Sequence, residues 1–266
     1  MLSVTINTDD APMLFQNRRS TKLTISFDRV ADIYDRTRSL PSEVMARLVE
    51  TLTNELAGCK TILDVGVGTG RFSKPLQDAG FEVVGIDVSK KMINKAKEKG
   101  AKNPLLSDAC SLPFRDNVFD AAACIHILHL ISRWRTALFE ICRVTRGSLV
   151  SLFYARKDSV RAAYNELLKK YGYERHRPGK SEQDLRELVS PSKTVFVCSY
   201  STSSDDRLTN LAQGTFSSQW EIPESVNRKV IEELRGQFAG KTFTQELYVT
   251  MWKIEDLKIF DSKAHL

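Results

Sequence analysis

The chain has 266 residues, enough for one large α/β domain with a lid and too few for two complete enzymes. Hydrophobic residues make up 42% and charged residues 27%, which is typical of a soluble globular protein. No apolar stretch approaches the roughly 20 residues needed to span a bilayer, which excludes a membrane helix. The net charge is +6, which fits an anionic substrate or nucleic acid. In one basic stretch, residues 90–102, apolar residues recur at helical spacing, which favours a solvated helix face over a nucleic-acid patch.

The N-terminus and the cysteines indicate a protein of the cytoplasm. Residues 1–22 are polar and lack the apolar core of a signal peptide, so we expect a polar N-terminal extension. The five cysteines form no C-x-x-C pair and have no histidine nearby at ligand spacing. This pattern predicts reduced thiols and no metal site.

Two helices are predicted before residue 60. The first covers 27–35, with apolar residues on one face. The second covers 41–56, begins at a proline that suits a first helical turn, and ends before Gly58. Together they define an N-terminal helical segment, residues 23–58, which we expect to act as a lid over the bound cofactor.

From residue 61 the pattern alternates between strand and helix. We predict strands over 61–65, 81–86, 104–106, 119–127 and 148–154, and helices over 72–79, 89–99 and 133–144. Helices over 159–171 and 181–189 and strands over 194–200 and 244–252 follow. Such alternation predicts a doubly wound α/β core over residues 59–266, with a mostly parallel seven-stranded sheet.

The last two predicted strands are separated by an insert at about 200–243. The insert begins polar, carries Phe216 and Trp220, and continues into a helix with one apolar face. A segment this long is often a functional lid, with disorder as the alternative.

The glycine-rich turn after the first strand carries the most chemical information. Residues 63–72 read LDVGVGTGRF, and the glycines permit a tight turn that a ligand can approach. In the dinucleotide fingerprint G-x-G-x-x-G, the third glycine stands where this chain has Arg71. Asp64, at the end of the strand, would repel a pyrophosphate and receive an ammonium group. The spacing therefore disfavours a nicotinamide-dependent dehydrogenase.

Two further acids are predicted at the ends of neighbouring strands. Asp87 follows the second strand, where a carboxylate accepts hydrogen bonds from ribose hydroxyls. Asp108 and Ala109 follow the third strand, where they can meet an adenine edge. The carboxyl ends of strands are where open α/β sheets bind ligands, although aspartate also serves as a helix cap.

Three blocks of sequence together resemble the class I S-adenosylmethionine-dependent methyltransferases, in the broad group of ubiquinone and menaquinone C-methyltransferases. They are LDVGVGTGRF, VVGIDVSKKM and SDACSLPFRDNVFDAAACIHILHLI, and upstream FDRVADIYDRTR resembles the N-terminal helix that closes over the cofactor in that family. The resemblance covers roughly the first 150 residues. It implies a Rossmann-like methyltransferase fold with a helical lid, S-adenosyl-L-methionine as cofactor, and methyl transfer as the activity.

The resemblance also implies roles for particular residues. The methionine part of the cofactor is expected near Gly66, Gly68, Gly70, Asp64, Tyr34 and Arg38. The adenosine part is expected near Asp87, Val88, Met92, Asp108 and Ala109.

The acceptor side is less determined. A general base is needed only if the acceptor must lose a proton, and the candidates are His129 and, second to it, His126. Phe216 and Trp220 either line the acceptor site or anchor the insert. We expect a small-molecule acceptor; an RNA methyltransferase and a non-catalytic adenosylmethionine-binding subunit are the alternatives. The sequence does not determine the oligomeric state.

Overall fold

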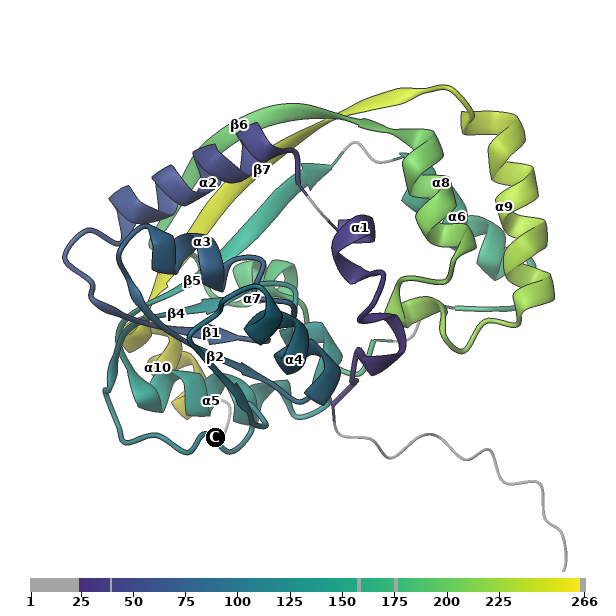
Figure 1. Cartoon of the computed structure of the whole chain (residues 1–266). Coiled ribbons are helices and arrows are strands. Elements are labelled where there is room, and N and C mark those ends of the chain that lie inside the picture. Colours follow the sequence, from purple (N-terminus) through teal and green to yellow (C-terminus); the bar gives the residue numbers. More distant parts are fainter. Residues whose placement is uncertain (1–23, 39, 157–158, 175–176, 264–266) are drawn as a thin grey trace, which may run out of the picture.

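The computed structural model describes residues 24–38, 40–156, 159–174 and 177–263. The predicted polar extension, residues 1–22, lies outside the described residues. A seven-stranded sheet forms the centre of the molecule (Figure 1). The strands are β1 (Thr61–Val65), β2 (Glu82–Asp87), β3 (Asn103–Leu106), β4 (Phe119–Cys124), β5 (Thr145–Arg156), β6 (Lys193–Ser203) and β7 (Thr242–Lys253).

The strand order is β3-β2-β1-β4-β5-β7-β6. All neighbours from β3 to β5 pair in parallel, whereas β7 is antiparallel to both β5 and β6. The predicted mostly parallel, seven-stranded α/β sheet is therefore confirmed. Because the chain winds outward in both directions from β1 and β4, the carboxyl ends of these two strands mark the switch point where such sheets bind ligands.

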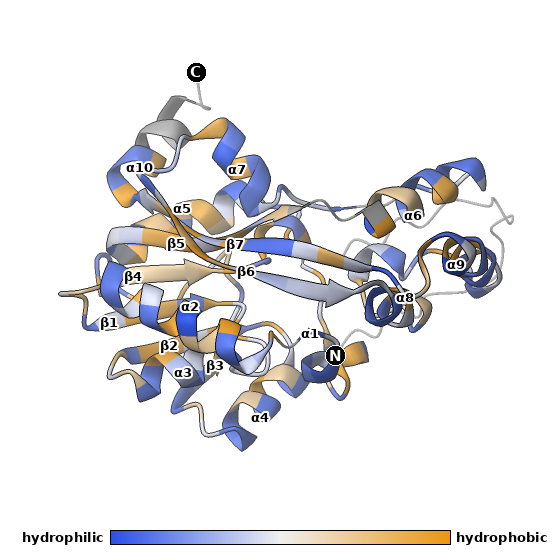
Figure 2. Ribbon diagram, turned by 90° about the horizontal axis from the view of Figure 1, so that it is seen from above, coloured by the Kyte–Doolittle hydropathy of each residue, from blue (hydrophilic) through white to orange (hydrophobic). Residues whose placement is uncertain are grey.

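Helices cover both faces of the sheet (Figure 2). One face carries α2 (Ser42–Glu55), α3 (Ser73–Asp78) and α4 (Lys90–Glu98); the other carries α5 (Trp134–Val144), α7 (Glu182–Leu188) and α10 (Ile254–Lys263). Side chains alternate along β1, so Ile62 joins the core beneath α2 and α3 while Leu63 joins the core beneath α5. Both are fully buried.

A separate group of helices, here called the helical cap, packs beside the sheet (Figure 1). It consists of α6 (Ser159–Lys170), α8 (Ser204–Ala212) and α9 (Glu224–Phe238), which share a buried apolar cluster of their own. The insert supplies α8 and α9, while α6 arrives from the other direction, after β5. At its centre the hydroxyl of Tyr164 donates to Oδ1 of Asn227 (2.7 Å), and Gln219 donates to both.

Two local predictions were wrong, and two helices were not predicted. The predicted helix over 27–35 is a 3-10 turn, η1 (Asp28–Val30), followed by a short helix, α1 (Tyr34–Arg38), because contacts of Asp28 with α4 hold the chain outside a regular helix. Strand β4 ends at Cys124 instead of continuing to Ile127, because His126 adopts a φ of 60°. The helices α8 and α10 were not predicted.

Among the residues that the structure describes, none of the helices is long and apolar enough to cross a bilayer.

Candidate active site

The glycine turn after β1 is shaped by close contacts. Gly66, Gly68 and Gly70 have φ values of 74°, 55° and 76°, the left-handed region that favours glycine. A Cβ on Gly66 would lie 2.0 Å from Cδ1 of Ile127, and one on Gly70 would lie 3.4 Å from Cα of Ala96 in α4. Gly66 and Gly68 line a cavity at the switch point, whereas Gly70 lies outside the lining and packs against α4.

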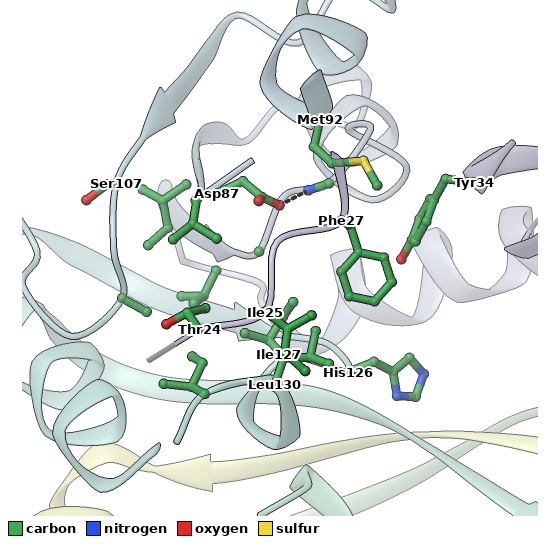
Figure 3. Close-up of a pocket in the computed structure, with 17 residues that line it drawn as sticks. Thr24, Ile25, Phe27, Tyr34, Asp87, Met92, Ser107, His126, Ile127 and Leu130 are labelled. Carbon is green, nitrogen blue, oxygen red and sulfur yellow. Dashed lines mark hydrogen bonds between the residues drawn. The ribbon is translucent and has the colours of Figure 1, made fainter. Parts of the chain in front are cut away.

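Asp87 connects the two strands that frame this cavity. Its carboxylate accepts a hydrogen bond from the N–H of Gly68 (3.0 Å, dashed in Figure 3) and another from the N–H of Ser89 (2.8 Å). Burial raises the pKa of Asp87, while these two N–H groups oppose the rise. The side chain is therefore fixed at the cavity wall, where sequence reasoning expected a ribose contact.

Asp64 and Asp108 lie outside the cavity lining. Asp64 is buried, with 3% of its surface exposed, and accepts a hydrogen bond from Oγ of Ser73 in α3 (2.6 Å). Burial raises its pKa from the ordinary 3.8 to about 6, against the opposing effect of Ser73. Asp108 accepts from the N–H of Cys110 (2.9 Å), so it forms a local turn. Neither acid is among the residues that line the cavity, and the roles expected of them toward a ligand stay predictions.

The cavity lining comes from three parts of the chain. The sheet and α4 contribute Val65, Gly66, Gly68, Ile86, Asp87, Val88, Met92, Ser107 and Ala109. The turn after β4 contributes His126, Ile127, Leu130 and Ile131, and the N-terminal segment contributes Thr24, Ile25, Phe27 and Tyr34. Of the predicted residues, Tyr34, Val88, Met92 and Ala109 thus reach the cavity together with Asp87 and two of the glycines.

The N-terminal segment 24–27 lies across the cavity. It belongs to the region 23–58 that was expected to form a lid over the cofactor, but sequence reasoning did not identify Thr24 and Ile25 as lining residues. Thr24 forms an antiparallel bridge with Ile131, and the N–H of Ile25 donates to the carbonyl of Leu130 (3.0 Å). Figure 3 shows Thr24 and Ile25 beside Ile127 and Leu130. The remaining volume is about 60 Å³, room for only a few water molecules. The sequence signal that could have indicated an extended segment here is the pair of β-branched residues Thr24 and Ile25.

The histidine at the cavity is His126, not His129. His126 stacks on Tyr154 with ring centroids 5.5 Å apart and an angle of 18° between the planes. His129 belongs to the 3-10 turn η2 (Leu128–Leu130), is absent from the cavity lining, and accepts a hydrogen bond on its carbonyl from the N–H of Gly179. Sequence reasoning preferred His129 because it extended β4 to Ile127; the earlier end of the strand changes which side chain faces the ligand edge.

Arg38 and Trp220 also lie outside the cavity lining and instead join the N-terminal segment to the insert. Arg38 donates to the carbonyl of Thr215 (3.0 Å), and its guanidinium lies 3.8 Å from the ring centroid of Phe216. The ring of Trp220 lies 5.1 Å from that of Phe27. Two interpretations were left open for Phe216 and Trp220: lining the acceptor site or anchoring the insert. These contacts agree with the second, because both residues hold the insert against the N-terminal segment.

Comparison with known proteins agrees with this arrangement. Residues 63–149 match the family model described as a methyltransferase domain. A demethylmenaquinone methyltransferase from Renibacterium salmoninarum is 33% identical over 160 residues, which are 57% of this chain and 68% of that protein. A malonyl-[acyl-carrier protein] O-methyltransferase from Hamiltonella defensa is 34% identical, over 50% of this chain and 51% of that protein. The chain therefore spans about two thirds of the first relative's length and half of the second's.

Two solved structures share the fold. A methyltransferase ascribed to an antibiotic biosynthesis pathway of Anabaena variabilis matches with a TM-score of 0.52 at 18% identity, over 76% of this chain and 96% of that one. The YcgJ protein from Bacillus subtilis matches with a TM-score of 0.51 at 21% identity, over 80% of this chain and 99% of that one. At these identities the likeness concerns the fold alone. Together with the family match, the sequence relatives place the chain in the class I S-adenosylmethionine-dependent methyltransferases, of the ubiquinone/menaquinone C-methyltransferase-like type.

Proposed function

We propose that this chain transfers the methyl group of S-adenosylmethionine to a small-molecule acceptor bound beside the turn after β4. The observation that carries the proposal is the cavity that brings Gly66, Gly68 and Asp87 together at the switch point of the sheet. A carboxylate at the end of β2 suits two vicinal hydroxyls. Met92 and Ala109 add apolar surface that suits a flat ring. The carboxylate of Asp87 and the apolar walls therefore fit the ribose and the adenine of an adenosyl group.

The residues around the cavity divide into two sets. In the first, Asp87 would hold the ribose, Val88 and Met92 would flank the adenine, and Ala109 with Ser107 would meet the edge of the adenine. In the second, Asp64, Gly70 and Asp108 would act indirectly, since each stabilises a turn behind the lining. When bound, the cofactor supplies a methyl group activated by its sulfonium. The protein's task is then to hold an acceptor in line with that group, at roughly 3 Å.

His126 is the residue that we propose to contact the acceptor. Its backbone occupies the left-handed region, which is uncommon for a residue with a side chain and is found at functional sites. Tyr154 stacks on the imidazole and limits its rotation. A histidine held in this way can orient an acceptor or take a proton from it.

A compact acceptor suits this enclosure better than a polynucleotide. The N-terminal segment closes the cavity, and its surroundings are mainly apolar. The two relatives are named for a demethylated menaquinone and for a malonyl group on a carrier protein, which are organic acceptors of different chemistry. We therefore propose a small organic acceptor, free or carried, in the cytoplasm.

Calorimetric titration with S-adenosylhomocysteine and with NAD tests the cofactor, and transfer of a labelled methyl group tests the acceptor. The acceptor panel would contain a demethylated naphthoquinone, a malonyl thioester and total tRNA. We expect binding of the adenosyl compound alone and transfer to an organic acceptor that His126→Asn reduces. Transfer to tRNA with a steep salt dependence would overturn the small-molecule proposal. Binding without any transfer would favour a non-catalytic subunit.

A further inference from the structure

Glu182, the first residue of α7, is a buried carboxyl group attached to the turn after β4. Only 4% of its surface is exposed. Its Oε1 atom accepts hydrogen bonds from the N–H of Ile127 (2.6 Å) and from the N–H of Leu128 (3.1 Å). Burying a carboxyl group is costly unless its oxygens are hydrogen-bonded, and here both N–H groups belong to consecutive residues of one turn.

That turn forms one side of the proposed cofactor cavity. His126, directly before the two N–H donors, adopts the left-handed conformation and lines the cavity. Ile127 also lines the cavity, and its side chain fills the space where a Cβ on Gly66 would stand. The carboxyl of Glu182 therefore holds the piece of backbone that connects the histidine to the glycine turn.

The chain before Glu182 is built to approach this turn closely. The N–H of Gly179 donates to the carbonyl of His129 (3.2 Å), and a Cβ on Gly179 would lie 2.2 Å from the carbonyl oxygen of Leu128. Ser181 then caps α7 in a reciprocal arrangement with Asp184, which fixes where the helix begins. The position of Glu182 is thus determined on both sides.

We infer that Glu182 is a positioning residue: it holds residues 126–128 so that the imidazole of His126 faces the acceptor and Ile127 supports the glycine turn. This inference rests on the proposed function, in which His126 and the glycine turn serve acceptor and cofactor. Glu182 touches neither, and it acts through the two backbone N–H groups.

Two substitutions of similar side-chain volume distinguish the effect of losing the hydrogen-bond acceptor from the effect of altered packing. Glu182→Gln keeps an oxygen that can accept both hydrogen bonds, whereas Glu182→Met removes it. We expect Glu182→Met to weaken binding of S-adenosylhomocysteine at least about tenfold, and Glu182→Gln to stay within about twofold of the wild type. Glu187→Met, on an exposed position of the same helix, is the matched control and should change nothing.

A second measurement does not depend on the cofactor. The ring resonances of His126, one of four histidines, can be assigned with His126→Asn and followed by NMR as the pH is changed. We expect Glu182→Met to shift these resonances, and Glu182→Gln to leave them as in the wild type. If Glu182→Met does not fold, Glu182→Asp, which withdraws the carboxylate by one methylene, should produce the same changes.

The outcomes distinguish the two proposals. If Glu182→Met lowers the melting temperature but leaves the His126 resonances and the affinity unchanged, Glu182 is only structural and the inference fails. If the wild type does not bind S-adenosylhomocysteine, the proposed function fails. The NMR comparison then still decides whether Glu182 positions His126.

Discussion

The carboxylate of Asp87 accepts a hydrogen bond from the N–H of Gly68 at 3.0 Å, which ties the end of β2 to the glycine turn after β1. Its other oxygen accepts from the N–H of Ser89 at 2.8 Å. One side chain therefore organises two turns and still faces the cavity. Substitution of this residue should affect both the arrangement of the site and its direct contact with a ligand.

We predict that Asp87→Ala lowers the affinity for S-adenosylhomocysteine by about a hundredfold, since it removes the proposed ribose acceptor and leaves two N–H groups without their partner. Calorimetric titration measures the affinity. Asp206→Ala, at an exposed position in α8, is the matched control and should bind as the wild type does. Equal affinities for the two variants would contradict the assignment of Asp87.

Gly66→Ala should impair both stability and cofactor binding, because the new Cβ would meet the side chain of Ile127. Gly58→Ala is a suitable control: its φ is 89°, and nothing lies within 4 Å of the added atom. The control should lose only the cost of a left-handed alanine, about 1–2 kcal/mol. Overpacking should cost Gly66→Ala about 1–3 kcal/mol more in the free energy of unfolding.

Urea denaturation and calorimetric titration measure these two effects. Equal destabilisation of the two variants, with unchanged affinity for S-adenosylhomocysteine, would show that Ile127 moves aside freely and that the contact with Gly66 does not shape the site.

The expected site residues that do line the cavity were identified from local sequence features. Gly66, Gly68 and Asp87 stand at the ends of strands whose parallel pairing brings them to one edge of the sheet. A short motif is sufficient there, because turn geometry and strand direction follow from nearby residues. These three residues therefore lie at the cavity, as the motif indicated. Their roles toward a cofactor stay predictions.

The misplaced residues depend on contacts between distant parts of the chain. His126 faces the cavity because β4 ends early, and that turn is held by Glu182, more than fifty residues later. Arg38 lies over Phe216 of the insert, a partner that periodicity cannot identify. Patterns in the sequence report which faces are apolar, but they do not report which distant segment covers them.

The stability of the protein should fall as the pH rises from about 4 to about 6 through the titration of Asp64. Burial raises the pKa of this carboxyl from 3.8 to about 6, so the folded protein keeps a proton that the unfolded chain has already released. Asp64→Asn removes this dependence. The free energy of unfolding of the variant, minus that of the wild type, should therefore increase by about 2 kcal/mol over that range.

Urea denaturation at several pH values measures this difference. Ser73→Ala is informative beside it, since the loss of the hydroxyl that donates to Asp64 should move the transition to higher pH. A difference that stays constant with pH would show that Asp64 is ionised throughout and stabilised by its surroundings.

Trp220 should report the movement of the N-terminal segment when the cofactor site is occupied. Thr24, Ile25 and Phe27 lie across the cavity, so we expect this segment to shift when the cofactor binds. The ring of Phe27 lies 5.1 Å from that of Trp220. A shift of Phe27 changes the surroundings of the indole, so we predict a change in tryptophan emission on addition of S-adenosylhomocysteine.

The same contact should slow the release of the cofactor. Trp220→Phe should abolish the change in emission, while Trp134→Phe, in α5, should preserve it. Trp220→Ala should accelerate dissociation of S-adenosylhomocysteine several-fold in stopped-flow displacement, because a contact between aromatic rings contributes about 0.5–1.5 kcal/mol. If Trp220→Ala leaves the dissociation rate unchanged, the insert does not restrain the N-terminal segment. The contacts of Arg38 with Thr215 and Phe216 would then serve only to hold the helical cap in place.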